Sequence, residues 1–93
     1  MSETKGKIVK VGLQLWRDGT ETDVSARRIA AVMGISHAAV LYWFENAEQM
    51  RDHVARVAVA TGDAAIIQKL IVSRHDAIAD MTPESRQAWL STL

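Results

Sequence analysis

The chain has 93 residues, a length that predicts a single domain. Of these residues 48% are hydrophobic and 24% are charged, a composition typical of a folded protein, and the formal net charge at pH 7 is zero. Its lack of cysteine excludes disulfides, thiolate zinc sites and cysteine nucleophiles. No apolar run is long enough to cross a membrane and the opening MSETKGK is not a signal peptide, so we expect a cytoplasmic protein without membrane contact.

Apolar residues recur at helical spacing along most of the chain, and no alternating strand pattern interrupts them, which predicts an all-α fold. A first helix is expected over residues 5–18, with Gly19 ending it as a C-terminal cap residue. A second helix is expected to begin at one of the capping side chains Thr22, Asp23 or Ser25.

The second helix is expected to end near Met33, because Gly34 predicts a sharp turn at that point. Ser36 is then the expected N-cap of a third helix over residues 37–44. A fourth helix, over residues 47–61, follows it.

Asn46 is the expected N-cap of the fourth helix, and Gly62 the residue that ends it. Asp63 opens a fifth helix, which is expected to continue to about Asp80. Thr82 caps a short last helix, and the proline after it occupies the first helical position, where its missing N–H breaks no hydrogen bond. The apolar residues of this last helix are Trp89, Leu90 and Leu93.

The second and third helices are short and joined by a tight turn, so they must pack at a steep angle. Ala30 is small enough to let the third helix approach, and Gly34 supplies the positive φ of the turn. The residues that fall where both helices face a common core are Ile29, Met33, Ile35, Val40 and Trp43. This is the pattern of a DNA-binding helix-turn-helix, although a helical hairpin of any bundle shares the spacing.

With those residues inside, the positions expected to face outward are Ser36, His37, Ala38, Leu41 and Tyr42. The third helix is then the expected recognition helix, with its N-terminal end against base edges. Arg27 and Arg28 on the second helix are placed to reach a phosphate. Lys5, Lys7 and Lys10 form a basic cluster that is either a further phosphate contact or a solvated helix end.

Three segments resemble the N-terminal DNA-binding domain of TetR-like transcriptional repressors. The stretch IVKVGLQLWRDG is similar to the opening helix of that family, RRIAAVMGIS to its Arg-x-Ile-Ala-x-x-Ala-Gly-Val-Ser, and VLYWFENAEQM to its Leu-Tyr-x-x-Phe and the following Lys-Glu-Glu-Leu. The resemblance covers residues 5–61. It implies a three-helix DNA-binding unit, with the fourth helix as the connection to a dimerising part.

Carried over by position, the resemblance implies that Arg27 and His37 contact backbone phosphate. It places Ser36, Ala38 and Tyr42 in or beside the major groove.

The chain departs from the family at Leu41, which aligns with the usual phosphate-contacting tyrosine, and at Ala47, which aligns with a frequent lysine. Few residues follow Gly62 where the family has a large ligand-binding domain, so we expect no ligand-sensing pocket and no cofactor. The helices after Gly62 are instead expected to form a homodimer, through Ile67, Leu70, Ile71, Ile78, Trp89 and Leu90.

Enzymatic chemistry is not expected from this sequence. His53 and His75 are isolated, and the RHD at residues 74–76 lacks the further His and Asp ligands that a metal-dependent phosphohydrolase needs. No Ser/His/Asp arrangement and no Gly-rich phosphate loop is present.

The sequence therefore predicts a three-helix, homeodomain-like helix-turn-helix unit at residues 5–46, followed by connecting and dimerisation helices at residues 47–93. The expected function is a small sequence-specific regulator, a repressor that binds an inverted repeat in double-stranded DNA as a homodimer. The neutral face of the third helix favours an alternative, a protein-interaction module (an anti-activator or adaptor) on the same frame. A DNA-packaging or replication accessory protein is a third reading.

Overall fold

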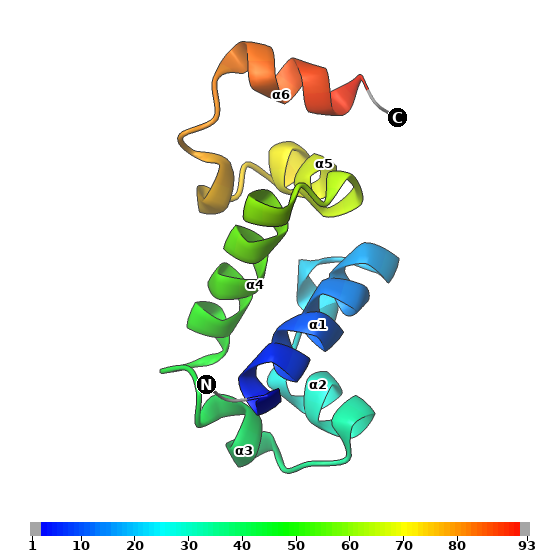
Figure 1. The fold of residues 1–93 in the computed structure, drawn as a ribbon, viewed down its shortest axis with the longest axis vertical. Helices are drawn as coiled ribbons and strands as arrows, with labels where there is room; N and C mark the ends of the chain where they lie inside the picture. The colour runs from blue at the N-terminus through cyan, green and yellow to red at the C-terminus, as the bar shows by residue number, and fades with distance from the viewer. Residues whose placement is uncertain (1–2, 92–93) are drawn as a thin grey trace.

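The computed structural model describes residues 3–91, and within that range every regular element is helical, which confirms the all-α expectation (Figure 1). In chain order the elements are α1 (Glu3–Asp18), the 3-10 helix η1 (Glu21–Asp23), α2 (Ala26–Met33), α3 (His37–Leu41), α4 (Ala47–Thr61), α5 (Ala64–Ser73), the 3-10 helix η2 (Asp76–Ile78) and α6 (Pro83–Leu90). No helix between residues 3 and 91 combines the length and the apolar character needed to cross a bilayer. Leu93, expected on the last helix, lies outside the described residues.

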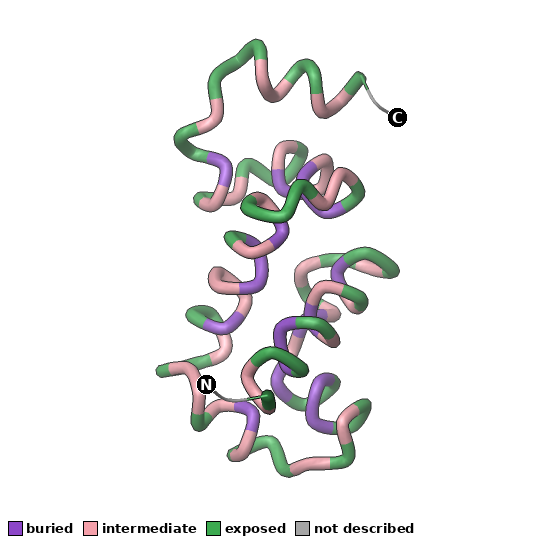
Figure 2. The backbone as a smooth tube through the Cα atoms, viewed as in Figure 1, coloured by how far each residue is buried: buried purple, intermediate pink, exposed green. Residues whose placement is uncertain are grey.

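The molecule is elongated, with principal extents of 41 × 22 × 21 Å. In Figure 1, α1, α2 and α3 occupy one end, α4 runs along the long axis, and α5 and α6 form the other end. The core follows this axis: Figure 2 shows buried positions where α1, α2 and α4 face one another, continuing into α5. The largest fully buried side chains are Trp16, Ile8, Ile29, Met50, Ile66, Ile67, Leu70, Val24, Val40 and Val54.

Helix starts are set by side chains that accept a hydrogen bond from a backbone N–H of the first turn. Four N-caps of this kind were expected and are confirmed, namely Ser36, Asn46, Asp63 and Thr82. Of the three candidates for the start of α2, the structure has Ser25 as the cap. Two helix ends are also confirmed, because Gly34 and Gly62 adopt the left-handed conformation, with φ of 70° and 72°. These short-range interactions explain why α2 and α4 have the expected bounds.

The helix end at Gly19 has a different cause from the one expected. Gly19 is not among the residues with positive φ, so it is no left-handed cap. A Cβ atom at Gly19 would instead overlap the carboxylate of Asp23, which accepts the backbone N–H of Thr20 at 2.8 Å. The glycine therefore leaves room for the Asp23 carboxylate where the η1 turn packs against the end of α1.

Two helices are shorter than expected. α3 ends at Leu41 rather than at residue 44, because the chain tightens into a turn in which Phe44 N–H donates to the Leu41 carbonyl at 3.1 Å. α5 ends at Ser73 rather than at Asp80, because Arg74 takes a left-handed φ of 57°. The break in α5 turns η2 back toward α4, where Ile78 enters the core.

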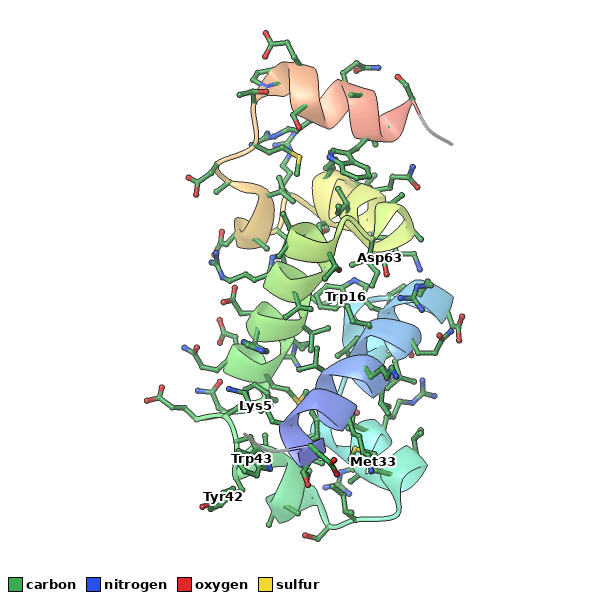
Figure 3. All side chains as sticks on the ribbon, viewed as in Figure 1. Lys5, Trp16, Met33, Tyr42, Trp43 and Asp63 are labelled. Atoms are coloured by element: carbon green, nitrogen blue, oxygen red, sulfur yellow. The ribbon has the colours of Figure 1, made fainter. Side chains whose placement is uncertain are left out.

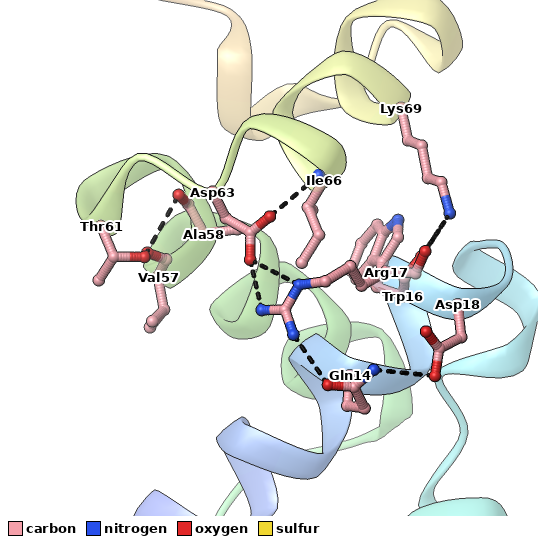
Figure 4. A network of polar contacts seen from close by, with 10 residues as sticks. All are labelled: Gln14, Trp16, Arg17, Asp18, Val57, Ala58, Thr61, Asp63, Ile66 and Lys69. Carbon is pink, nitrogen blue, oxygen red and sulfur yellow. Dashed lines mark hydrogen bonds and ion pairs between the residues drawn. The ribbon is translucent and has the colours of Figure 1, made fainter. Parts of the chain in front are cut away.

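A polar cluster joins the C-terminal end of α1 to α5 (Figure 4). The Lys69 ammonium donates to the carbonyls of Trp16 at 2.8 Å and Arg17 at 2.9 Å, and also to that of Gly19. The Arg17 guanidinium donates to the carboxylate of Asp63, which caps α5. We call Arg17, Asp63 and Lys69 the α1–α5 clasp; it fixes α5 against the first helix.

Candidate nucleic-acid interface

The turn between α2 and α3 depends on Ala30 and Gly34. Ala30 is buried, and its carbonyl accepts hydrogen bonds from the N–H groups of both Gly34 and Ile35. The left-handed Gly34 then reverses the chain, so that α3 begins four residues after α2 ends and packs against it. Ile29 and Val40 are fully buried at this contact, as expected.

Of the other three residues expected in this core, none is fully buried. Met33, Ile35 and Trp43 are half-buried and pack against the main cluster.

Four of the five residues expected on the outer face of this pair are exposed: Ser36, His37, Ala38 and Tyr42. Tyr42 is 78% exposed and points away from the molecule in Figure 3. Its ring meets the ring of Trp43 edge-on, with centroids 5.0 Å apart. Trp43 is half-buried and packs against the core, so it supports the exposed tyrosine ring from the inner side.

Leu41 differs from the expectation. It is half-buried and packs against the core cluster, so its side chain is not free to reach a thymine methyl. Leu41 is the last residue of α3 and directly follows the fully buried Val40, so its side chain lies beside the inner face of the helix.

The cations beside α3 differ in how freely they could meet a phosphate. Arg27 is exposed and has no ion pair among the described residues. Arg28 is paired with Asp23 at 2.9 Å. The Thr20 N–H bond, helped by the charge of Arg28, lowers the pKa of the Asp23 carboxyl, so this pair stays ionised well into acid. Arg27 is therefore the better placed of the two arginines.

Lys5, Lys7 and Lys10 lie on α1, and the first of them approaches Phe44, which follows α3. Lys7 and Lys10 are exposed, whereas Lys5 is half-buried with its ammonium 5.6 Å from the centroid of the Phe44 ring. The same ring contacts His53 on α4, with centroids 5.5 Å apart. Burial, and then the charge of Lys5, lower the pKa of His53 below its usual value of 6.5, so this imidazole is neutral at pH 7.

The residues expected at a dimer interface fall into two groups. Ile67, Leu70 and Ile78 are buried inside the single chain, where a second subunit cannot reach them. Ile71, Trp89 and Leu90 are half-exposed. Sequence analysis missed Val72 on α5, whose side chain is 78% exposed, the largest exposed fraction of any large apolar residue described in α5 and α6. Its position on the helix opposite the buried stripe is the signal that identifies it.

His53 and His75 each contact an aromatic ring in the structure. No group of three or more His, Asp or Glu side chains within residues 3–91 is arranged to hold a metal ion. His75 instead caps η2 by accepting the Ala77 N–H at 3.0 Å, and its ring meets Trp16 edge-on at 5.8 Å. Its Nε2 lies 3.7 Å from a carboxylate oxygen of Glu21, so the residue ties η2 to η1.

We compared the chain with protein-family models, with curated proteins and with solved structures, and none of the three comparisons found a match.

Proposed function

We propose that the protein is a small cytoplasmic DNA-binding regulator, which represses transcription by binding an inverted repeat as a homodimer. The observation that carries this proposal is the free outer surface of α3. Ser36, His37 and Ala38 are exposed together at the start of that helix, and the exposed Arg27 lies on the helix packed against it.

In this proposal α3 enters the major groove, where the Ser36 hydroxyl and the His37 imidazole offer hydrogen bonds to base edges. Ala38 presents a methyl group that suits contact with a thymine methyl, and Arg27 neutralises a backbone phosphate. Tyr42, whose ring contacts that of Trp43, extends the DNA-binding surface of α3 along the groove.

Such a surface binds weakly at one half-site. Each bidentate side-chain contact to a base contributes about 1–3 kcal/mol of discrimination, and α3 carries no arginine, asparagine or glutamine to make one. A dimer doubles the number of contacts, and the usual helix-turn-helix geometry sets the half-sites about 34–36 Å apart. Affinity from phosphate contacts then falls steeply as salt is raised.

Selection of bound sequences from a random DNA pool tests the proposal directly. Enrichment of an inverted repeat is the expected result. On the selected site, Arg27→Ala should weaken binding to all sequences alike, whereas His37→Ala or Tyr42→Ala should also change the preferred bases. Arg56→Ala is the matched control, because Arg56 is an exposed arginine on α4 that pairs with Asp52. If none of the three variants differs from this control, α3 is not the reading element.

One observation favours a second function, a protein-interaction module that does not recognise a DNA sequence. The residues of α3, HAAVL, include no Arg, Lys, Asn, Gln, Asp or Glu. A mobility-shift assay with random genomic fragments at low and moderate salt distinguishes the two functions. If the protein shifts DNA fragments only at low salt and no sequence is enriched, the result would favour the protein-interaction module.

A further inference from the structure

A groove of about 710 Å³ runs along α1 beside the C-terminal end of α2. Its floor is apolar and is formed by Val11 and Leu15 of α1 with Val32 and Met33 of α2. Figure 3 shows Met33 on this side of the molecule, where α2 meets α1. Val32 is the most exposed of these four residues, with 64% of its surface accessible to solvent.

The rim of the groove is positively charged. Lys7, Lys10 and Arg17 line it, and none of its lining residues is acidic. Arg17 is already neutralised by Asp63 in the α1–α5 clasp. Lys7 and Lys10 are exposed and form no ion pair within residues 3–91, so their charge is available to a partner.

We propose that this groove binds an acidic amphipathic helix of a partner protein. An apolar floor with a cationic rim matches a helix that has one apolar face flanked by carboxylates. From Lys7 to Arg17 the helix rises about 15 Å, at 1.5 Å per residue, which is the length of nearly three helical turns. A partner helix of that length places two or three apolar anchors on the floor.

Other occupants fit the groove less well. A duplex would satisfy the lysines but would leave Val32 and Leu15 against phosphates. A second copy packed symmetrically through this groove would bring two copies of the same cationic rim together, which repel. The chain's own α6, the helix without a buried residue, has one Glu and one Arg and so offers no net negative charge.

Two helix-stapled synthetic peptides of about 14 residues, with the same leucine positions and either glutamates or lysines beside them, test the proposal. Binding is measured by fluorescence anisotropy, and the site is located by backbone amide chemical shifts. We expect saturable binding of the glutamate peptide, at least tenfold weaker binding of the lysine peptide, and shifts centred on Val11, Leu15, Val32 and Met33.

Substitutions of exposed residues then test the site without disturbing the core. Val32→Glu should weaken the glutamate peptide at least tenfold, and Lys10→Glu should weaken it while strengthening the lysine peptide. Val72→Glu, the same change at another exposed valine, on α5, should leave both affinities unchanged.

Three results of the peptide measurements would overturn the proposal. They are no saturable binding of the glutamate peptide, equal affinities for both peptides, or a Val32→Glu variant that binds like Val72→Glu. Displacement of the peptide by a random-sequence duplex that shifts the Val32 and Lys10 amides would also overturn it, by assigning the groove to nucleic acid. None of these measurements depends on sequence-specific recognition, so failure here is distinct from failure of the proposed regulator.

Discussion

Replacing Lys69 with methionine should destabilise the protein by about 2–3 kcal/mol. The Lys69 ammonium donates to three carbonyls at the end of α1, at 2.8 Å to Trp16 and 2.9 Å to Arg17, with Gly19 as the third. The last four carbonyls of a helix have no partner within the helix, and a cation near them contributes about 0.3–2 kcal/mol. Methionine keeps most of the aliphatic stem, so that the loss reports the ammonium and not the packing.

The size of this loss in stability depends on how much each of the three hydrogen bonds of Lys69 contributes. Hydrogen bonds to a charged group contribute about 1.5–3 kcal/mol each to stability. Lys69 is half-exposed, however, and water can replace the ammonium at the carbonyls once it is gone. The three bonds also share one charge, so their contributions to stability do not add in full. Together they contribute little more than one strong hydrogen bond to a charged group.

Urea unfolding measures this loss, followed by helical circular dichroism and by the fluorescence of Trp16 and the other two tryptophans. Lys10→Met is the control, because Lys10 is an exposed lysine of α1 without an ion pair among the described residues, and it should change stability by about 0.5 kcal/mol or less. For a domain of this size, a loss of about 2–3 kcal/mol lowers Tm by about 10–20 °C. If Lys69→Met lowers stability no more than Lys10→Met, the Lys69 ammonium does not stabilise the contact between α5 and the first helix.

Two further predictions concern stability. Arg74→Gly should stabilise the fold by about 0.5–1 kcal/mol in urea titrations, because Arg74 ends α5 at a φ of 57° that glycine adopts without strain; an unchanged or lower midpoint would contradict this. Stability should also fall as the pH drops below 6.5, because the pKa of His53 is lowered in the fold and the unfolded chain takes up the proton first. His53→Gln should reduce that slope between pH 7 and 5, and an identical slope in the variant would refute the assignment.

Much of the fold follows from interactions within four residues of one another, and these could be predicted. Ser25, Ser36 and Asn46 each accept an N–H three residues ahead. Sequence alone therefore locates the starts of α3 and α4, and it limits the start of α2 to three neighbouring candidates. The end of α5 could not be found in this way, since its apolar stripe continues to Ile78. The break at Arg74 is accompanied by the contacts of the next residue with Trp16 and Glu21, which are distant in sequence.

The candidate site was predictable to a similar extent. Helical period predicts the exposure of Ser36, His37 and Tyr42, because it depends only on which neighbours are apolar. The same reasoning cannot distinguish a side chain buried in its own subunit from one buried against another. Ile67 and Leu70 were expected at a dimer interface for that reason, and both lie in the core of the chain.

The fifteen residues of α4 separate the two ends of the molecule and span about 22 Å at 1.5 Å per residue. Over a helix of that length, a small rotation at one end produces a large displacement at the other end. A tilt of about 10° at the α5 end displaces the α3 end by about 4 Å, close to the 3.4 Å between successive base pairs. In a dimer joined through α5 and α6, a slight change in the angle between subunits would therefore move each α3 by about one base pair along the duplex.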